Sequence, residues 1–347
     1  MIRRIISRLQ RFRDIVRRKA GIFLFDAPKA KPIDARETRS ILFIRHDAKL
    51  GDAIVSSGVI SKLRKYRPDI KLMVMTSETM APMFKQDFQV DDVIVIKKRP
   101  SYAEIRQICR GIGAVDMVVS LNQDMKMKDI YLFKCLDSKL NVGLDSGVKR
   151  INVNIQPYIR TAHYAEKFDY IATLIGIDGP QEPYMVPVKA ESLARVQAFL
   201  VEHKLQRYAL LNPFGSGSER KLDAAKINQI IDHIWTEYRL PVVVLSAPDT
   251  RELLNALPVE FSEHAIHFDQ SRSIFDAIAA VELAQLVISV DTAIVHIATG
   301  LNKPQIAIYR KDEINFKNWH PNSKRAKIIF SEGGINNFNI VQGDLML

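Results

Sequence analysis

The sequence has few cysteines, no long apolar run and little net charge outside its N-terminus. Its two cysteines, Cys109 and Cys135, are not near other cysteines or histidines at metal-ligand spacing, so we predict no zinc site. Few and unpaired cysteines are typical of a reducing cytoplasm. No run of about 18 uncharged apolar residues occurs, so we predict no transmembrane helix. The 347 residues, 47% hydrophobic and 26% charged, fit an ordinary globular protein of two domains.

Positive charge is concentrated in residues 1–31. They contain ten Lys or Arg residues and two acids, and so account for eight of the eleven net positive charges. Their apolar residues recur at helical spacing: Ile2, Ile5, Ile6, Leu9, Phe12, Ile15 and Val16. This pattern is typical of a helix on an anionic membrane surface, and we expect such an arm to be dispensable for the chemistry. Packing on the protein body is an alternative. Binding to nucleic acid is another, although no nucleic-acid-binding motif accompanies the arm.

From residue 40 onward, short apolar runs alternate with helical patterns. In the first half we predict strands at 41–45, 71–76, 90–96 and 114–121, with helices at 52–65 and 162–176. A proline-rich connection follows at 177–188. In the second half we predict strands at 208–213, 241–247, 265–269, 286–291 and 304–309, and helices at 223–239, 272–284 and 292–299. The pattern predicts an α/β protein with two doubly wound halves facing a cleft. Ligands are expected beyond the carboxyl ends of the strands.

The first candidate loop is RHDAKLGDAIVSS at 45–57, between a strand and a helix. Asp52 is placed at the predicted helix start, where it could simply be the N-cap. A carboxylate kept ionised there could also take a proton from a substrate hydroxyl. Asp47 is the rival base in the same loop.

Two further loops are candidates for an anion site. In NPFGSGSERKL at 212–222, Gly215 and Gly217 would allow backbone N–H groups to approach an anion, and Lys221 would add charge. A flexible loop is the alternative. In SVDTAIVH at 289–296, Asp291 ends a strand, and Thr292 and His296 share one face of the helix that follows. This placement suits a diphosphate, although a single histidine on a helix is usually structural.

These motifs together resemble glycosyltransferase family 9, the ADP-heptose lipopolysaccharide heptosyltransferases, over roughly residues 40–320. The similarity is carried by DTAIVH at 291–296, KLGDAIVSSGVI at 49–60 and HYAEKFDYIATLIGI at 163–177. It implies a GT-B fold of two Rossmann-like domains, here 40–185 on the acceptor side and 186–347 for the nucleotide sugar with a C-terminal tail, after a basic arm at 1–39. It also implies inverting transfer of heptose to the inner core of lipopolysaccharide, without a metal or other cofactor.

The resemblance assigns roles residue by residue. Asp52 matches the catalytic base. The donor-binding positions are Ser216, Ser218, Lys221, Asp291, Thr292, Ala293 and His296, with the two serines as approximate counterparts of threonines. The donor substrate would be an ADP-sugar, although no acid aligns with the family's ribose-binding position after strand 241–247.

Basic clusters in the first half could bind the acceptor, a Kdo- or heptose-bearing lipid A. They comprise Lys49, Lys97, Lys98, Arg99, Lys126 and Lys128. They could equally be solvated surface. The arm at 1–31 would then place a cytoplasmic enzyme on the inner membrane, with no specific nucleic-acid partner. Alternative functions are transfer from another nucleotide sugar, or non-catalytic binding of a nucleotide sugar or a membrane.

Overall fold

The computed structural model describes residues 2–30, 32–46 and 49–340, and side chains are described for all of these except 2–9, 11 and 218. The chain divides into two compact units. The first contains the described residues up to Lys49 together with Gly58–Glu182. The second contains Leu50–Ser57 and the described residues from Pro183 onward. The first two turns of helix α2 (Leu50–Tyr66) therefore cluster with the second unit.

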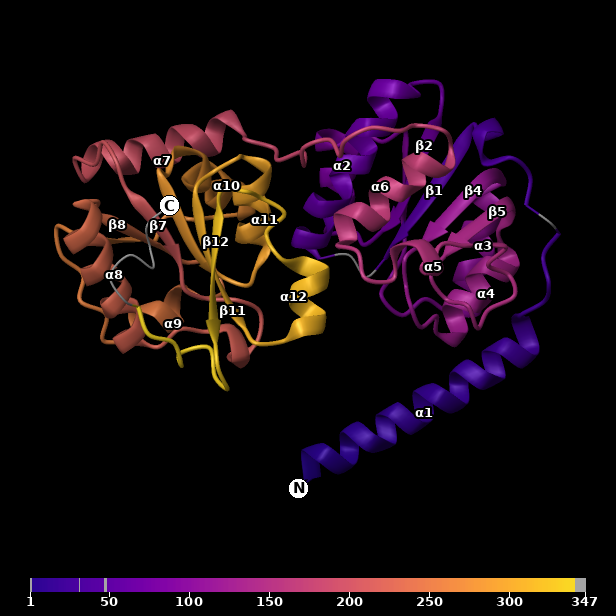
Figure 1. Cartoon of the computed structure of the whole chain (residues 1–347), viewed down its shortest axis with the longest axis horizontal. Coiled ribbons are helices and arrows are strands. Elements are labelled where there is room, and N and C mark those ends of the chain that lie inside the picture. Colours follow the sequence, from indigo (N-terminus) through magenta and orange to yellow (C-terminus); the bar gives the residue numbers. More distant parts are fainter. Residues whose placement is uncertain (1, 31, 47–48, 341–347) are drawn as a thin grey trace. The chain divides into compact units, whose positions relative to one another are not determined.

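The first unit is built on a parallel six-stranded sheet (Figure 1). Its strands are β1 (Ser40–Arg45), β2 (Lys71–Thr76), β3 (Asp92–Val95), β4 (Ala114–Ser120), β5 (Asp137–Gly143) and β6 (Val153–Asn154). Their order is β3-β2-β1-β4-β5-β6, the arrangement of a Rossmann domain. In the central strand, Phe43 is in register with Val74 of β2 and Val119 of β4. Strand β1 is buried from Ile41 onward, as expected for a sheet covered on both faces.

Helices precede, connect and follow these strands. They are α1 (Ile2–Phe25), α2, α3 (Tyr102–Ile112), α4 (Met127–Cys135), α5 (Gln156–Ile159) and α6 (Tyr164–Leu174), with short helical turns at Ala35–Glu37 and Met83–Asp87. Helix α3 shows why the local sequence forms a helix. The Ser101 hydroxyl accepts from the backbone N–H of Glu104, and the Glu104 carboxylate accepts from that of Ser101. The helix ends at Ile112 and is followed by Gly113, whose φ of 72° suits glycine.

The second unit repeats the same plan. Its strands are β7 (Ala209–Asn212), β8 (Val242–Leu245), β9 (Ala265–Phe268), β10 (Leu286–Val290), β11 (Gln305–Arg310) and β12 (Ala326–Ser331). They are parallel, in the order β12-β11-β10-β7-β8-β9, so that β7 and β10 are central. The helices are α7 (Ala190–Glu202), α8 (Ala224–Tyr238), α9 (Arg251–Asn255), α10 (Ile274–Leu283), α11 (Ala293–Gly300) and α12 (Glu313–Trp319). The carboxyl ends of β7 and β10 therefore lie side by side, which brings the loops after them together.

Helix α1 packs on the first unit through its C-terminal part, against α4. The Arg18 guanidinium donates to both carboxylate oxygens of Asp145, at 2.6 and 2.8 Å. The Phe25 ring contacts that of Tyr131 at a centroid distance of 4.8 Å. Asp26 accepts hydrogen bonds from the backbone N–H groups of Lys149 and Arg150. This part of the basic segment therefore follows the self-packing alternative.

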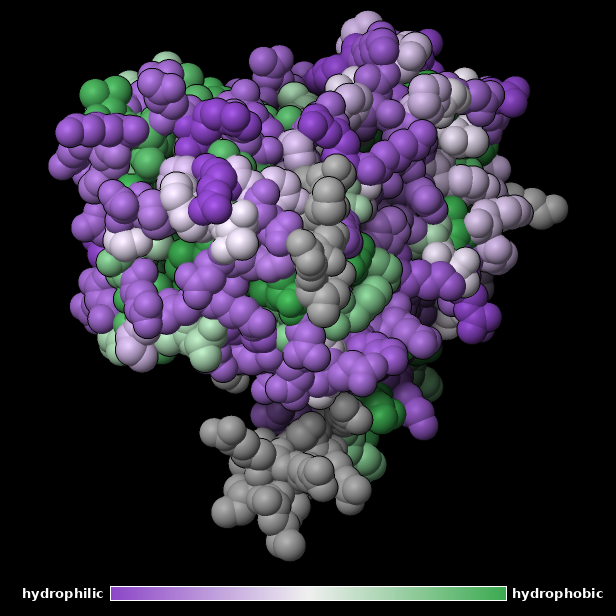
Figure 2. Space-filling view, turned by 60° about the vertical axis from the view of Figure 1, so that its left-hand side comes forward, coloured by the Kyte–Doolittle hydropathy of each residue, from purple (hydrophilic) through white to green (hydrophobic). Residues whose placement is uncertain are grey.

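Farther toward the N-terminus, α1 exposes apolar side chains. Phe12 is 67% exposed, and Ile15 and Val16 are about half exposed. Phe23, on the same side of the helix, is 87% exposed. The visible face of the molecule is otherwise mostly hydrophilic, with hydrophobic side chains in small patches (Figure 2). Among the described helices, none is long and apolar enough to cross a membrane.

Candidate functional site

The start of helix α11 forms a polar site at the end of strand β10. Thr292 is the N-cap of the helix, and its hydroxyl accepts from the backbone N–H of Ile294 at 3.2 Å. Asn212, at the end of the neighbouring strand β7, donates to this hydroxyl at 3.0 Å and to the Ser289 hydroxyl at 2.9 Å. The two central strands thus fix the Thr292 side chain. The positive end of the α11 dipole is at Ala293, where an anion would be favoured.

Asp291 is held in place beside this helix start. Its carboxylate accepts from the Asn315 amide at 3.0 Å and lies 3.4 Å from the Arg220 guanidinium. Arg220 also donates to the backbone carbonyl of Asp291 at 3.1 Å. Asp291 is only 8% exposed, so these contacts offset the cost of burying its charge.

The loop after β7 lies against the same helix start. The Gly215 N–H donates to the Arg220 carbonyl at 2.7 Å, which folds the loop back on itself. A Cβ at Gly215 would come within 2.9 Å of Thr292 Cγ2, so only glycine fits this approach without a shift. Ser216 is exposed and Lys221 is half-buried, whereas the side chain of Ser218 lies outside the described residues. The loop and the helix start predicted from the sequence as separate motifs are therefore in contact.

His296 lies one turn farther along α11 and is 4% exposed. Burial, helped by the nearby His320, lowers the pKa of His296 to about 4, so the imidazole is neutral at pH 7. Its ring meets that of Trp319 edge to face, at 6.1 Å between centroids. Its Nδ1 is buried, with no hydrogen-bond partner among the described residues. An unpartnered buried nitrogen is costly, which favours a bound ligand or water there.

Asp52 lies in the first turn of α2, within the second unit. The interpretation of Asp52 as the N-cap is wrong, because the helix begins two residues earlier at Leu50, with Lys49 as its N-cap. A Cβ on Gly51 would lie 3.0 Å from Cδ2 of the His296 ring. Asp52, which is half-buried, therefore follows a residue whose backbone comes close to α11. Asp47, the rival base, lies outside the described residues.

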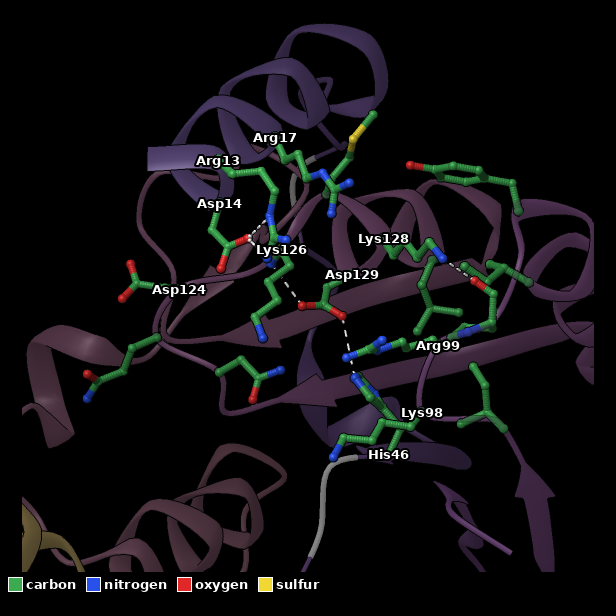
Figure 3. Close-up of a pocket in the computed structure, with 18 of the residues that line it drawn as sticks. Arg13, Asp14, Arg17, His46, Lys98, Arg99, Asp124, Lys126, Lys128 and Asp129 are labelled. Atoms are coloured by element: carbon green, nitrogen blue, oxygen red, sulfur yellow. Dashed lines mark hydrogen bonds and ion pairs between the residues drawn. The ribbon is translucent and has the colours of Figure 1, made fainter. Parts of the chain in front are cut away.

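The basic clusters are distributed unequally around a cavity of about 1010 Å³ in the first unit (Figure 3). Lys98, Arg99, Lys126 and Lys128 line it. Lys97 does not line it and instead pairs with Glu104, at 2.7 Å on the exposed surface. Lys49 is exposed and is likewise absent from the cavity wall. The structure therefore brings together four of the six candidate acceptor residues.

The sequence interpretation missed several residues of these sites. They are Asn212, Arg220 and Asn315 around α11, and Arg13 and Arg17 at the cavity. Arg220 lies inside a loop singled out from the sequence, but nothing in its spacing indicates contact with Asp291. Asn315 comes from α12, a helix that the sequence interpretation did not predict.

Comparisons with known proteins identify the family and the fold of the chain. A sequence model of glycosyltransferase family 9 (heptosyltransferase) matches residues 105–341. Lipopolysaccharide heptosyltransferase 3 of Escherichia coli is 23% identical over 290 residues, covering 78% of this chain and 84% of the relative.

Two solved structures share the fold. A glycosyl transferase family 9 protein from Veillonella parvula superimposes with a TM-score of 0.67 at 17% identity, covering 87% of this chain and 89% of the other. E. coli heptosyltransferase WaaC, solved with ADP, gives 0.62 at 17% identity, covering 86% of this chain and 93% of the other. These two structures have the GT-B fold predicted from the sequence.

Proposed function

The chain belongs to glycosyltransferase family 9 and is a glycosyltransferase, and we propose that it transfers heptose from ADP-heptose to the inner core of lipopolysaccharide, with inversion. Relatives named as lipopolysaccharide heptosyltransferases support the reaction class. The ADP in the similar WaaC structure supports an adenine nucleotide as the donor part. The observation that carries the proposal is the capped N-terminus of α11, with the Gly215 loop lying directly against it.

The donor diphosphate is proposed to bind at the N-terminus of α11. Thr292 and Ala293 present the helix start, and the Gly215 loop lies directly against it. Lys221 and Ser216 come from the same loop, and Ser218 is assigned with them from the family resemblance. Asp291 would act mainly by holding Arg220 and the helix start in position. The buried Nδ1 of His296 would gain a partner in the complex.

The proposed chemistry is a direct displacement at the anomeric carbon. Asp52 would take the proton from the acceptor hydroxyl as its oxygen attacks, and ADP would leave from the opposite face. Negative charge grows on the diphosphate as the bond breaks, so donors fixed at the α11 start favour the transition state over the bound substrate. Protein groups would supply this stabilisation, and we propose that no metal or organic cofactor takes part.

The acceptor is proposed to bind in the cavity of the first unit. Lipid A carrying Kdo or heptose presents carboxylates and phosphates, which suit Lys98, Arg99, Lys126 and Lys128. A cavity of about 1010 Å³ is large enough for more than one sugar ring.

The apolar stripe of α1, defined as Phe12, Ile15, Val16 and Phe23, is proposed to rest on the cytoplasmic face of the inner membrane. Large exposed apolar side chains beside basic residues are typical of interfacial helices. Peripheral attachment would bring the enzyme to an acceptor that is itself anchored in lipid.

The test is transfer by the purified full-length chain to a Kdo- and heptose-bearing acceptor. ADP-heptose would be compared with ADP-glucose and with UDP-, GDP- and CMP-sugars. We expect ADP release and a matching mass increase of the acceptor with ADP-heptose only. Transfer from a different nucleotide sugar would establish the alternative donor. Binding of ADP without transfer to any acceptor would favour the non-catalytic alternative.

A further inference from the structure

The cavity of the first unit has two walls of different origin. One wall comes from the loops before α3 and α4, with Lys98, Arg99 and Lys126. The other comes from α1, through Arg13 and Arg17. Figure 3 shows the two α1 arginines on one side, Lys98 and Arg99 on the opposite side, and Lys126 between them.

Positive charge in this cavity exceeds the negative charge available to pair with it. Six Lys or Arg residues line it, against three acids: Asp14, Asp124 and Asp129. Asp14 accepts from the Arg13 guanidinium. Asp129 accepts from the backbone N–H of Lys126 and lies 3.5 Å from Nε2 of His46.

Several of the cations therefore have no carboxylate partner. Within the described part of the chain, Arg17, Lys98, Arg99 and Lys126 form no ion pair. Like charges facing one another across a cavity repel, and a ligand with several negative groups relieves that repulsion.

The position of the α1 wall is fixed by the docked part of the helix. Arg18, the residue after Arg17, binds Asp145 with both of its terminal nitrogens, and Asp145 is 3% exposed. Arg18 also donates to the Met125 carbonyl at 2.6 Å, next to Lys126 on the opposite wall. The Arg18 pair with Asp145 thus anchors the helix one residue away from Arg17, which faces the cavity. Arg13 lies about one helical turn before Arg17.

We propose that α1 is part of the acceptor site, with Arg13 and Arg17 binding anionic groups of the acceptor together with Lys98, Arg99 and Lys126. The ligand class is a saccharide that carries two or more phosphate or carboxylate groups. The inference rests on the proposed function for the identity of the acceptor, but its geometry stands without the transfer reaction. Arginine suits this role because its guanidinium binds phosphate and carboxylate through paired hydrogen bonds.

The experiment compares Arg17→Gln with Lys19→Gln. Both remove one positive charge from α1, but Lys19 is exposed and does not line the cavity. The probe is a deacylated inner-core saccharide that carries its Kdo carboxylates and phosphates but no lipid, and calorimetry measures its Kd. We expect about a tenfold rise in Kd for Arg17→Gln, a larger rise when Arg13→Gln is added, and less than twofold for Lys19→Gln. With dephosphorylated saccharide, the difference in Kd between Arg17→Gln and Lys19→Gln should be smaller.

Two results would overturn the inference. In one, Arg17→Gln and Lys19→Gln weaken saccharide binding equally, which would show a general charge effect. In the other, Arg17→Gln leaves the affinity for the lipid-free saccharide unchanged and affects only binding to vesicles of anionic phospholipid, which would make Arg17 a membrane contact. Unchanged thermal midpoints of the variants verify folding.

The readouts separate this inference from the proposed function. Saccharide binding that depends on Arg17, with no transfer from any nucleotide sugar, would sustain the α1 site and refute the proposed reaction. Conversely, Arg17→Gln could transfer heptose from ADP-heptose with an unchanged KM for the saccharide. This result would support the proposed reaction and refute the α1 site. ADP affinity should be the same in all of these variants, because the α11 site contains none of the altered residues.

Discussion

Arg18 and Asp145 form a paired ion bridge that joins helix α1 to the first unit, with guanidinium to carboxylate distances of 2.6 and 2.8 Å. The Asp145 side chain is 3% exposed and also accepts from the backbone N–H groups of Met125 and Gly147. The hydrogen bond to Asp145 raises the pKa of Arg18, so the guanidinium stays charged at any physiological pH. The helix is therefore tied to the loops on which the cavity is built.

We expect Arg18→Ala to lower the free energy of unfolding by about 2 to 3 kcal/mol, because it leaves a buried carboxylate without its cation. Arg13→Ala is the matched control. It breaks an exposed pair with Asp14 and should cost about 0.5 kcal/mol or less. Urea denaturation of both variants measures the difference, and equal losses would mean that the bridge does not anchor the helix.

We expect combined replacement of Phe12, Val16 and Phe23 by serine to reduce pelleting with anionic vesicles at least tenfold, because each removes apolar surface from the proposed membrane contact. Stability in solution should not change, since these side chains are exposed. Tyr158→Ser, at a 71% exposed aromatic on α5, is the control and should pellet like the unmodified protein. Full retention of vesicle binding by the triple variant would rule out the stripe as the contact. Added salt should weaken only the part of vesicle binding that comes from the basic residues.

We expect Asp52→Asn to reduce transfer at least a hundredfold while ADP affinity stays within about twofold, because the amide cannot accept the acceptor proton. Single-turnover assays and calorimetry give the two quantities. Asp47→Ala is the comparison. An inactive Asp47→Ala together with an active Asp52→Asn would assign the base to the other carboxylate.

We expect Gly215→Ala to weaken ADP binding about tenfold, because its Cβ would come within 2.9 Å of both Thr292 Cγ2 and Arg220 Cβ. The loop must move away from the α11 start to accept it. Gly111→Ala is the control, since a Cβ at Gly111 has no atom within 4 Å. Calorimetry with ADP should show an effect at position 215 only. An unchanged ADP affinity in Gly215→Ala would show that the loop is not part of the nucleotide site.

We expect His296 to make the protein less stable as the pH falls from about 6.5 toward 4. Its pKa is near 4 in the folded state against an ordinary value of 6.5, so the unfolded chain binds the extra proton first. Stability from the neutral ring is complete above pH 6.5 and declines below it, by up to about 3 kcal/mol in all. His296→Gln should flatten this part of the profile, measured by urea denaturation at several pH values. A profile with unchanged slope would show that other groups cause the acid loss.

The repeated strand and helix pattern made the two Rossmann-like halves predictable, because the central strands are continuous apolar runs. Strand β5 was not predicted, since its buried positions include Ser138 and Asn141, which bond to each other at 2.6 Å. A polar strand of this kind is stabilised by partners that only the folded chain provides. Edge strand β12, with its partly exposed Phe330, likewise lay outside the prediction.

The candidate site was predictable where a motif is local, and not where it depends on distant contacts. A helix start after strand 286–291 followed from the apolar run that precedes it. Its cap was expected at Asp291, but the structure places the cap at Thr292, and the helix begins at Ala293. The contact between Arg220 and Asp291 was not predictable, because the two residues are far apart in sequence. The basic arm was interpreted as separable from the body, but Arg18 and Phe25 dock it there. Removal of residues 1–31 would therefore also remove one of the two walls of the cavity.

The exposed apolar stripe of helix α1 and its two arginines at the cavity, Arg13 and Arg17, lie on different sides of the helix. Arg13 lies about 100° around the helix axis from Phe12, and an α-helix with its side chains is about 10 Å thick. If the stripe lies at the bilayer surface, the anionic groups held by Arg13 and Arg17 are about one helix diameter from it. The helix would then act as a spacer that sets the depth at which an acceptor can be bound. Sugars close to the lipid would fit, and the outer sugars of a longer chain would lie beyond reach.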